Sequence, residues 1–286
     1  ELLASLLRYY RFITREFFDE ETGEVYNTIG KDPTTKRLYN APWMALMTLE
    51  MYKLTGDETY LDKMVRLLKV YYTIGGERFY PNGLSMFETV DALRSAGKTE
   101  DAEEITELFR KHVTNIKNFG INYPEHEVRY EQTIVSPAAA LNVEMFMITG
   151  EKEWLDEAEK HAGILERFNG RQPCYLLNNL ALRHWDAFWF GKRRIFGDTF
   201  PHTASIHSSD ALIQCAECSG DKKMAKRAVM GARNCLCLFR EDGSASCTRV
   251  HPLYVNGVRA EYYDEFANEQ DGYLYFMIKY FGALDK

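Results

Sequence analysis

One short pattern occurs four times in the chain: an apolar helical run ends at Gly and leads through polar residues into a second helical run. Glycine readily adopts the left-handed conformation that ends a helix. The acidic residues that follow suit the positive end of the next helix, and an apolar residue then packs that helix back on the first. Each copy therefore predicts a tight helical hairpin. The four copies lie at residues 54–61, 95–102, 148–155 and 218–225.

Helical periodicity on both sides of the turns supports the hairpins. The helix that enters a turn is apolar on most of its circumference, whereas the helix that leaves it is amphipathic. We therefore expect incoming helices to be buried on two sides and outgoing helices on one. About eleven helices are expected, at 1–18, 39–54, 57–74, 85–96, 99–118, 134–149, 151–168, 173–188, 203–218, 221–238 and 266–281. The incoming helices start near Tyr39, Ser85, Ile134, Pro173, Thr203 and Phe266.

Six incoming and about six outgoing helices predict an all-α fold, an (α/α)6 toroid of inner and outer helices, complete or incomplete. An irregular stretch at 189–202 stands where a sixth outgoing helix would lie. Strand signal is scarce, and we expect at most a minor β-hairpin within 244–262, on the Asn256-Gly257 turn. A helical solenoid is the structural alternative. The spacing of 41, 53 and 70 residues between turn glycines is uneven, which favours a ring with functional loops.

The formal net charge of −7 argues against a polyanion binder that works through a basic surface, so nucleic acid is not an expected partner. No run approaches the roughly 20 apolar residues of a membrane helix, so no membrane association is expected. The chain begins at Glu1, without Met and inside an expected helix. We expect one catalytic domain over 1–286, as a fragment or a processed or trimmed chain. It would be soluble, and cytoplasmic, or periplasmic or secreted if a signal peptide has been removed.

The six cysteines suggest thiols rather than disulfides, because a chain of this length does not need disulfide staples. Cys215 and Cys218 share one helix face, and Cys235 and Cys237 lie in the next helix. A zinc site is one interpretation, but the single-residue gap in the second pair is unusual for a zinc knuckle. We expect buried free thiols, and no metal or other cofactor.

Given these turns and uneven loops, most of the chain resembles the six-hairpin glycosidase superfamily. The four turns look like those of its glucuronidases, unsaturated glucuronyl hydrolases and toroid-fold polysaccharide lyases. The resemblance implies a carbohydrate cleft lined by loops at one end of the inner helices. The aspartate-bearing motifs of the unsaturated glucuronyl hydrolases and the paired-histidine segment of the heparinase-type lyases are not found. The resemblance therefore bears on architecture more than on chemistry.

The densest group of polar and aromatic residues lies at 178–203, where Gly191 and Gly197 allow close backbone approach. Tryptophan faces suit pyranose rings, arginine suits a uronate carboxylate, and aspartate can act as acid or base. The alternative is a solvated loop with helix-capping aspartates. Catalytic candidates are Asp186, Asp198 and His202. Binding candidates are Asn178, Asn179, His184, Trp185, Trp189, Lys192, Arg193 and Arg194, followed by His207 and Asp210, which would share a helix face.

Other inner-helix starts supply further candidates. Tyr130 and Glu131 precede the apolar run of one such helix and are candidate catalytic residues. Glu131 is either a catalytic carboxylate or a first-turn partner of the helix dipole. Residues 262–273 either reach the same cleft or form a solvated face. Trp43, at the first inner helix, is either a sugar platform or a core residue.

Two mechanisms fit these residues. A hydrolase needs two carboxyl groups, one of them protonated. A lyase needs a cation or amide to neutralise a uronate carboxylate, and a His or Tyr to take the C5 proton; Arg193, Asn178, His202 and Tyr130 suit these roles. Because the candidate carboxylates are spread over several loops, the sequence favours a glycoside hydrolase acting on an acidic, glucuronide-type oligo- or polysaccharide. A lyase, an epimerase and a non-catalytic helical scaffold that binds proteins are the alternatives.

Overall fold

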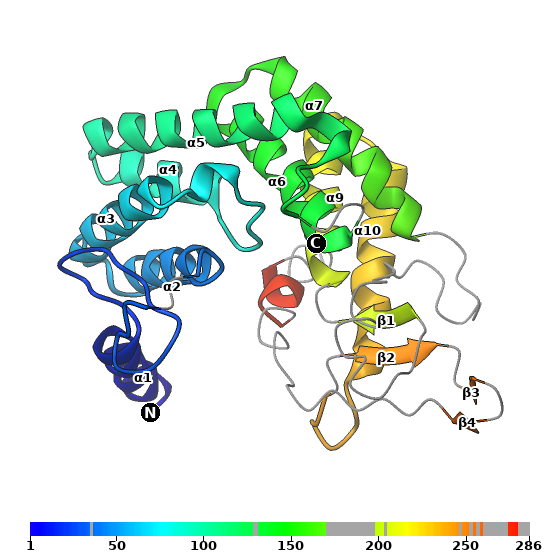
Figure 1. Cartoon of the computed structure of the whole chain (residues 1–286), viewed down its shortest axis with the longest axis horizontal. Coiled ribbons are helices and arrows are strands. Elements are labelled where there is room, and N and C mark those ends of the chain that lie inside the picture. Colours follow the sequence, from blue (N-terminus) through cyan, green and yellow to red (C-terminus); the bar gives the residue numbers. More distant parts are fainter. Residues whose placement is uncertain are drawn as a thin grey trace. The chain divides into compact units, whose positions relative to one another are not determined.

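In the computed structural model, the described residues are largely α-helical (Figure 1). The structure describes residues 1–34, 37–127, 131–169, 198–202, 205–245, 248–251, 254–255, 258–259 and 274–279. The helices are α1 (Leu2–Glu16), α2 (Asn40–Thr55), α3 (Thr59–Thr73), α4 (Met86–Ser95), α5 (Thr99–Phe119), α6 (Gln132–Thr149), α7 (Lys152–Leu165), α9 (Ser205–Ser219) and α10 (Lys222–Asn234). Short 3-10 helices are η1 (Gly76–Arg78), η2 (Gly120–Asn122), η3 (Glu166–Asn169) and η6 (Cys235–Leu238).

The expected helices that fall within the described residues are present, with ends within a few residues of the prediction. The expected helix at 173–188 lies outside the described residues, and the one at 266–281 is described only at 274–279, which is helical. Of the helices described, none combines the length and apolar character needed to cross a bilayer.

The turn glycines have the expected left-handed conformation. At the third hairpin, the amide of Gly150 donates to the carbonyl of Phe146 at 2.7 Å and closes the last turn of α6. The hydroxyl of Thr149 donates to the carbonyl of Met145 and accepts from the amide of Glu151. The Thr149 hydroxyl thus hydrogen-bonds with a backbone carbonyl before the turn and a backbone amide after it. The φ angles are 71° at Gly56, 74° at Gly97, 72° at Gly150 and 77° at Gly220.

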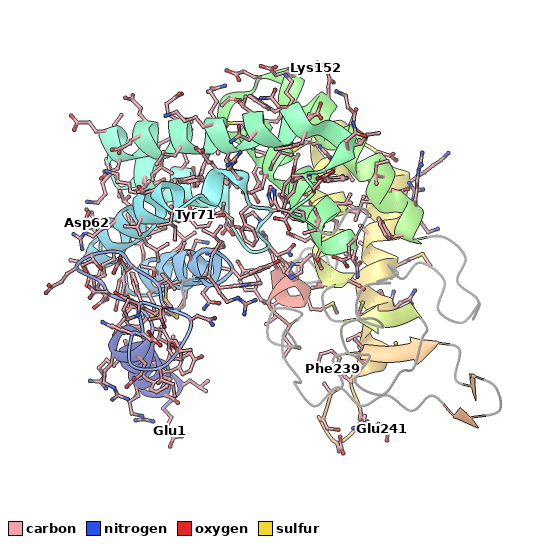
Figure 2. All side chains as sticks on the ribbon, in the orientation of Figure 1. Glu1, Asp62, Tyr71, Lys152, Phe239 and Glu241 are labelled. Atoms are coloured by element: carbon pink, nitrogen blue, oxygen red, sulfur yellow. The ribbon has the colours of Figure 1, made fainter. Side chains whose placement is uncertain are left out.

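Burial separates incoming from outgoing helices as expected. In α9 nearly every residue from 205 to 216 is buried, whereas α3 buries one face. Figure 2 illustrates the two faces of α3, because Tyr71 lies among other side chains while Asp62 points outward. Apolar character all round thus marks helices enclosed by neighbours.

The described chain divides into two compact units. Unit 1 comprises Glu1–Asn118 with Glu144–Glu151, and unit 2 comprises Phe119–Val143 with Lys152–Lys286. In unit 1, α2 packs on α3; in unit 2, α9 packs on α7 and α10. The expectation of a single domain over the whole chain stays a prediction.

Two ion pairs of unit 1 link a turn to the preceding outgoing helix. Lys98, which follows the turn glycine Gly97, contacts Asp62 of α3 at 2.6 Å. Glu151, the residue after the next turn glycine, contacts Arg110 of α5, also at 2.6 Å. These pairs are partly exposed, so each contributes at most about 1 kcal/mol, but each ties one hairpin to the next.

Within the described parts of the chain, two small antiparallel sheets accompany the helices. Strands β3 (Tyr254–Val255) and β4 (Val258–Arg259) flank positions 256 and 257, which confirms the expected hairpin. Strand β1 (Asp198–His202) pairs with β2 (Thr248–His251). At 198–202 the expectation of an irregular stretch is therefore wrong, and Asp198 begins a strand instead of capping a helix. Its register is irregular between Thr199 and His202, the interval that contains Pro201, which has no amide proton to donate.

Two buried tyrosine–histidine pairs join neighbouring elements. In unit 1, the Tyr72 hydroxyl lies 3.2 Å from Nδ1 of His112, whose Nε2 lies 2.7 Å from the carbonyl oxygen of Phe79. In unit 2, the Tyr123 hydroxyl lies 2.8 Å from Nδ1 of His161. In unit 1, Nε2 carries a proton to donate to the carbonyl, and when the ring is neutral Nδ1 accepts from the tyrosine. Burial lowers the pKa of each histidine to about 4.

These histidines predict loss of stability in mild acid. Unfolded histidine binds a proton near pH 6.5 but the folded histidines do so only near pH 4, so the free energy of unfolding falls as pH drops through that window. The loss by pH 4 is about 3 kcal/mol per histidine at most. Urea unfolding of His112→Gln or His161→Gln should show a shallower pH dependence than wild type. The exposed control His126→Gln should keep the full slope, and equal slopes in all variants would contradict the assignment.

Two glycines offer a matched test of the hairpin turn. At Gly150 a Cβ would meet no atom within 4 Å, so the cost of Gly150→Ala comes from the left-handed backbone conformation alone. We expect the free energy of unfolding to fall by about 1–2 kcal/mol. Gly163 lies inside α7, also without close atoms, so Gly163→Ala should stabilise by up to about 1 kcal/mol. The midpoints of denaturant unfolding should fall for Gly150→Ala and rise for Gly163→Ala. A neutral Gly150→Ala would mean that the turn does not depend on its left-handed residue.

Candidate functional site

The first residues of α6 and α9 meet within unit 2 (Figure 1). The side-chain amide of Gln132 donates from Nε2 to the Ser205 hydroxyl at 3.1 Å. The Ser208 hydroxyl donates to Oε1 of the same amide at 2.9 Å. All three side chains are buried. Two helix starts that are 73 residues apart in sequence are therefore joined by one side chain.

Glu131 immediately precedes Gln132, the first residue of α6. Its carbonyl oxygen accepts from the amides of Ile134 and Val135, at 3.0 and 3.1 Å. Its carboxylate accepts from the amide of Thr133 at 2.8 Å and from the hydroxyl of the same residue. Glu131 thus has the contacts of a helix N-cap, and a negative charge there also suits the helix dipole. Of the two interpretations drawn from sequence, these contacts favour the capping role.

His207 and Asp210 are the third and sixth residues of α9, close to its start as expected. His207 is buried, and its ring meets the edge of Phe276 at a centroid distance of 5.5 Å. Asp210 accepts from the side-chain amide of Gln214 at 3.0 Å. The structure therefore brings His207 together with the C-terminal helical segment 274–279, which directly follows the candidate stretch 262–273.

Trp43 lies in α2 of unit 1. Its indole ring is half-buried and packs against Gly83, where a Cβ would approach the ring to 2.9 Å. Glycine at 83, with φ of 78°, leaves room for the ring. This contact supports a packing role, although the sugar-platform interpretation stays a prediction.

Of the remaining candidate site residues, the structure describes only two. Asp198 and His202 are the first and last residues of β1, and their backbones pair with His251 and Thr248 of β2. The other candidates lie outside the described residues: Tyr130, Asn178, Asn179, His184, Trp185, Asp186, Trp189, Lys192, Arg193 and Arg194. Their assignment to a site stays a prediction.

The cysteines that the structure describes behave as thiols. Cys215 and Cys218 are free, and Cys215 is buried. Burial raises the pKa of the Cys215 and Cys235 thiols well above the usual value, so both stay protonated. Among the residues that the structure describes, no group of three or more His, Cys, Asp or Glu side chains is suited to hold a metal ion. The expectation that the chain needs no metal stays a prediction.

Sequence reasoning missed the role of Gln132. The residue was visible as a polar position at the start of an apolar helix, together with Tyr130 and Glu131. Its partners Ser205 and Ser208 are three residues apart and share a face of α9. Nothing in the sequence pairs the two helices, so only the three-dimensional structure identifies the bridge.

Comparison with solved structures gives a match over nearly the whole chain. The chain is similar to a polysaccharide lyase, with 37% sequence identity, a TM-score of 0.85 and 97% of this chain covered. The match covers 40% of the lyase, so the chain spans about two fifths of that protein's length. No protein-family model matches the chain. No curated protein matches it either.

More distant structures have the same fold. An α-1,6-mannanase from a Salegentibacter species matches with 16% identity and a TM-score of 0.56, over 94% of this chain and 84% of the mannanase. An unsaturated glucuronyl hydrolase from a Bacillus species matches with 15% identity and a TM-score of 0.56, over 92% of this chain and 71% of the hydrolase. These likenesses confirm the all-α, (α/α)6 toroid class and the resemblance to six-hairpin enzymes.

The cap contacts of Glu131 predict the effect of replacing it. Glu131→Ala removes the acceptor for the Thr133 amide, so we expect a loss of about 1–2 kcal/mol in the free energy of unfolding. Glu131→Gln keeps an acceptor oxygen and should lose less than half as much. The exposed control Glu159→Ala should stay within about 0.5 kcal/mol of wild type. Denaturant unfolding checks the order, and a Glu131→Ala variant as stable as the control would rule out the cap.

Proposed function

We propose that this chain is the toroid part of a polysaccharide lyase that cleaves a uronate-containing glycan by β-elimination. The observation that carries the proposal is the 37% identity to a polysaccharide lyase over 97% of the chain. The mannanase and the glucuronyl hydrolase are 15–16% identical, which speaks for a common fold and not for a common reaction. The proposal therefore replaces the hydrolase favoured by sequence with the lyase that was its alternative.

In β-elimination the candidate residues have roles that differ from those in hydrolysis. A cation or amide, Arg193 or Asn178, neutralises the uronate carboxylate and so acidifies the proton on C5. His202 or Tyr130 then takes that proton. The electron pair of the C5–H bond forms the C4–C5 double bond, the C4–O4 bond breaks, and the leaving oxygen receives a proton. No water is consumed and no pair of carboxyl groups is needed.

An acidic substrate suits the charges of the chain. Lys192, Arg193 and Arg194 are three consecutive cations between aromatic residues in a protein whose formal net charge is −7. A local basic group in an acidic protein attracts a uronate without making the whole surface a polyanion binder. Arginine is well suited to this task because its planar guanidinium pairs bidentately with a carboxylate.

One absorbance measurement tests the reaction. The 4,5-double bond of the product is conjugated with the carboxylate and absorbs in the near ultraviolet, so absorbance should rise on a uronate polysaccharide. Asp186→Asn and Asp198→Asn should keep activity within about tenfold, whereas His202→Ala or Tyr130→Phe should lose at least about a hundredfold. New reducing ends without absorbance, together with inactive Asp variants, would instead establish hydrolysis.

A further inference from the structure

We propose that Gln132 is a positioning residue that fixes the register between the starts of α6 and α9 for the elimination reaction. This inference rests on the proposed function. The observation behind it is the pair of hydrogen bonds from one buried amide to two serines of the other helix. Because the Gln132 side chain is fully buried, its role is to act through its neighbours and not to touch substrate.

The geometry of the bridge favours a single register. Ser205 and Ser208 are one helical turn apart, so the amide of Gln132 spans a turn of α9. The amide nitrogen only donates and the amide oxygen only accepts, and the two serines satisfy both atoms. A shift of α6 along α9 by one residue is about 1.5 Å and would strain or break both bonds. Apolar contacts between the helices are non-directional and resist such a shift less.

The bridge is adjacent to candidate site residues on both helices. Tyr130, a candidate base of the elimination, stands two residues before Gln132 in sequence. On α9, His207 lies between the two serines that hold the amide. Groups that act together in catalysis need their separation held within about 0.5 Å, and a misplacement of about 1 Å can reduce the rate a hundredfold. Gln132 is placed to hold that separation.

Asn142 provides a matched control on the same helix. Its side chain is also fully buried in α6. Among the described residues, its amide donates within the helix, to the carbonyl oxygen of Ala138 at 2.8 Å. Asn142→Leu therefore removes a buried amide of the same helix without removing a link to α9.

The first measurement is steady-state lyase activity on a uronate polysaccharide. We expect Gln132→Leu to lower kcat at least tenfold with KM changed less than threefold. Asn142→Leu should keep kcat within twofold of wild type. The triple variant Gln132→Leu, Ser205→Ala, Ser208→Ala removes every polar group of the bridge, so it should recover stability but not kcat. Recovery of kcat with stability, or equal kcat losses in the two single variants, would overturn the proposal.

A second measurement needs no substrate and so separates this inference from the proposed function. Backbone hydrogen exchange at the first turns of α6 and α9 should be faster in Gln132→Leu than in wild type and unchanged there in Asn142→Leu. If the wild-type protein cleaves no uronate polysaccharide, the proposed function is refuted. The exchange measurement would then still show whether Gln132 holds the starts of α6 and α9 together. Equal exchange at both helix starts in wild type and Gln132→Leu would refute the positioning role.

Discussion

The left-handed glycine at each helical turn is the constraint on which the rest of the fold depends. A residue with positive φ ends one helix and lets the next begin at once, so the two helices must pack against each other. The residues next to the glycines then connect successive hairpins, as Lys98 does with Asp62 and Glu151 with Arg110. A local backbone conformation thus sets which surfaces meet, and apolar burial supplies the stability.

The same arrangement concentrates polar groups at helix starts. An incoming helix that is buried on most sides is mainly apolar along its length, and many of its polar side chains lie near its ends. In unit 2 these ends are ordered by specific bonds: Glu131 caps α6, and Gln132 joins α6 to α9. Catalytic chemistry at such a place profits from rigid elements, because each residue inherits its position from a helix that cannot move independently.

Periodicity predicted the helices because each depends on its own residues, and the hairpin around Asn256-Gly257 followed from a local turn signal. Strand β1 was missed because Asp198 and Thr199 pair with residues about 50 positions away, and no local pattern reports such a partner. The Gln132 bridge was missed for the same reason. Glu131 was ambiguous because a carboxylate at a helix start is equally suited to a cap and to catalysis. Its contacts with Thr133 are visible only in the three-dimensional structure.

The cysteines lie in one of the two units only, so they can serve as a natural chemical label of that unit. All six cysteines fall between positions 174 and 247, so unit 1 contains none and unit 2 contains every thiol in the chain. Cys215 and Cys235 are buried and protonated, so a thiol reagent reaches them only after their surroundings open. Modification at these two positions therefore reports the opening of unit 2 alone. Comparing its rate with that of global unfolding shows whether unit 2 opens by itself or together with unit 1.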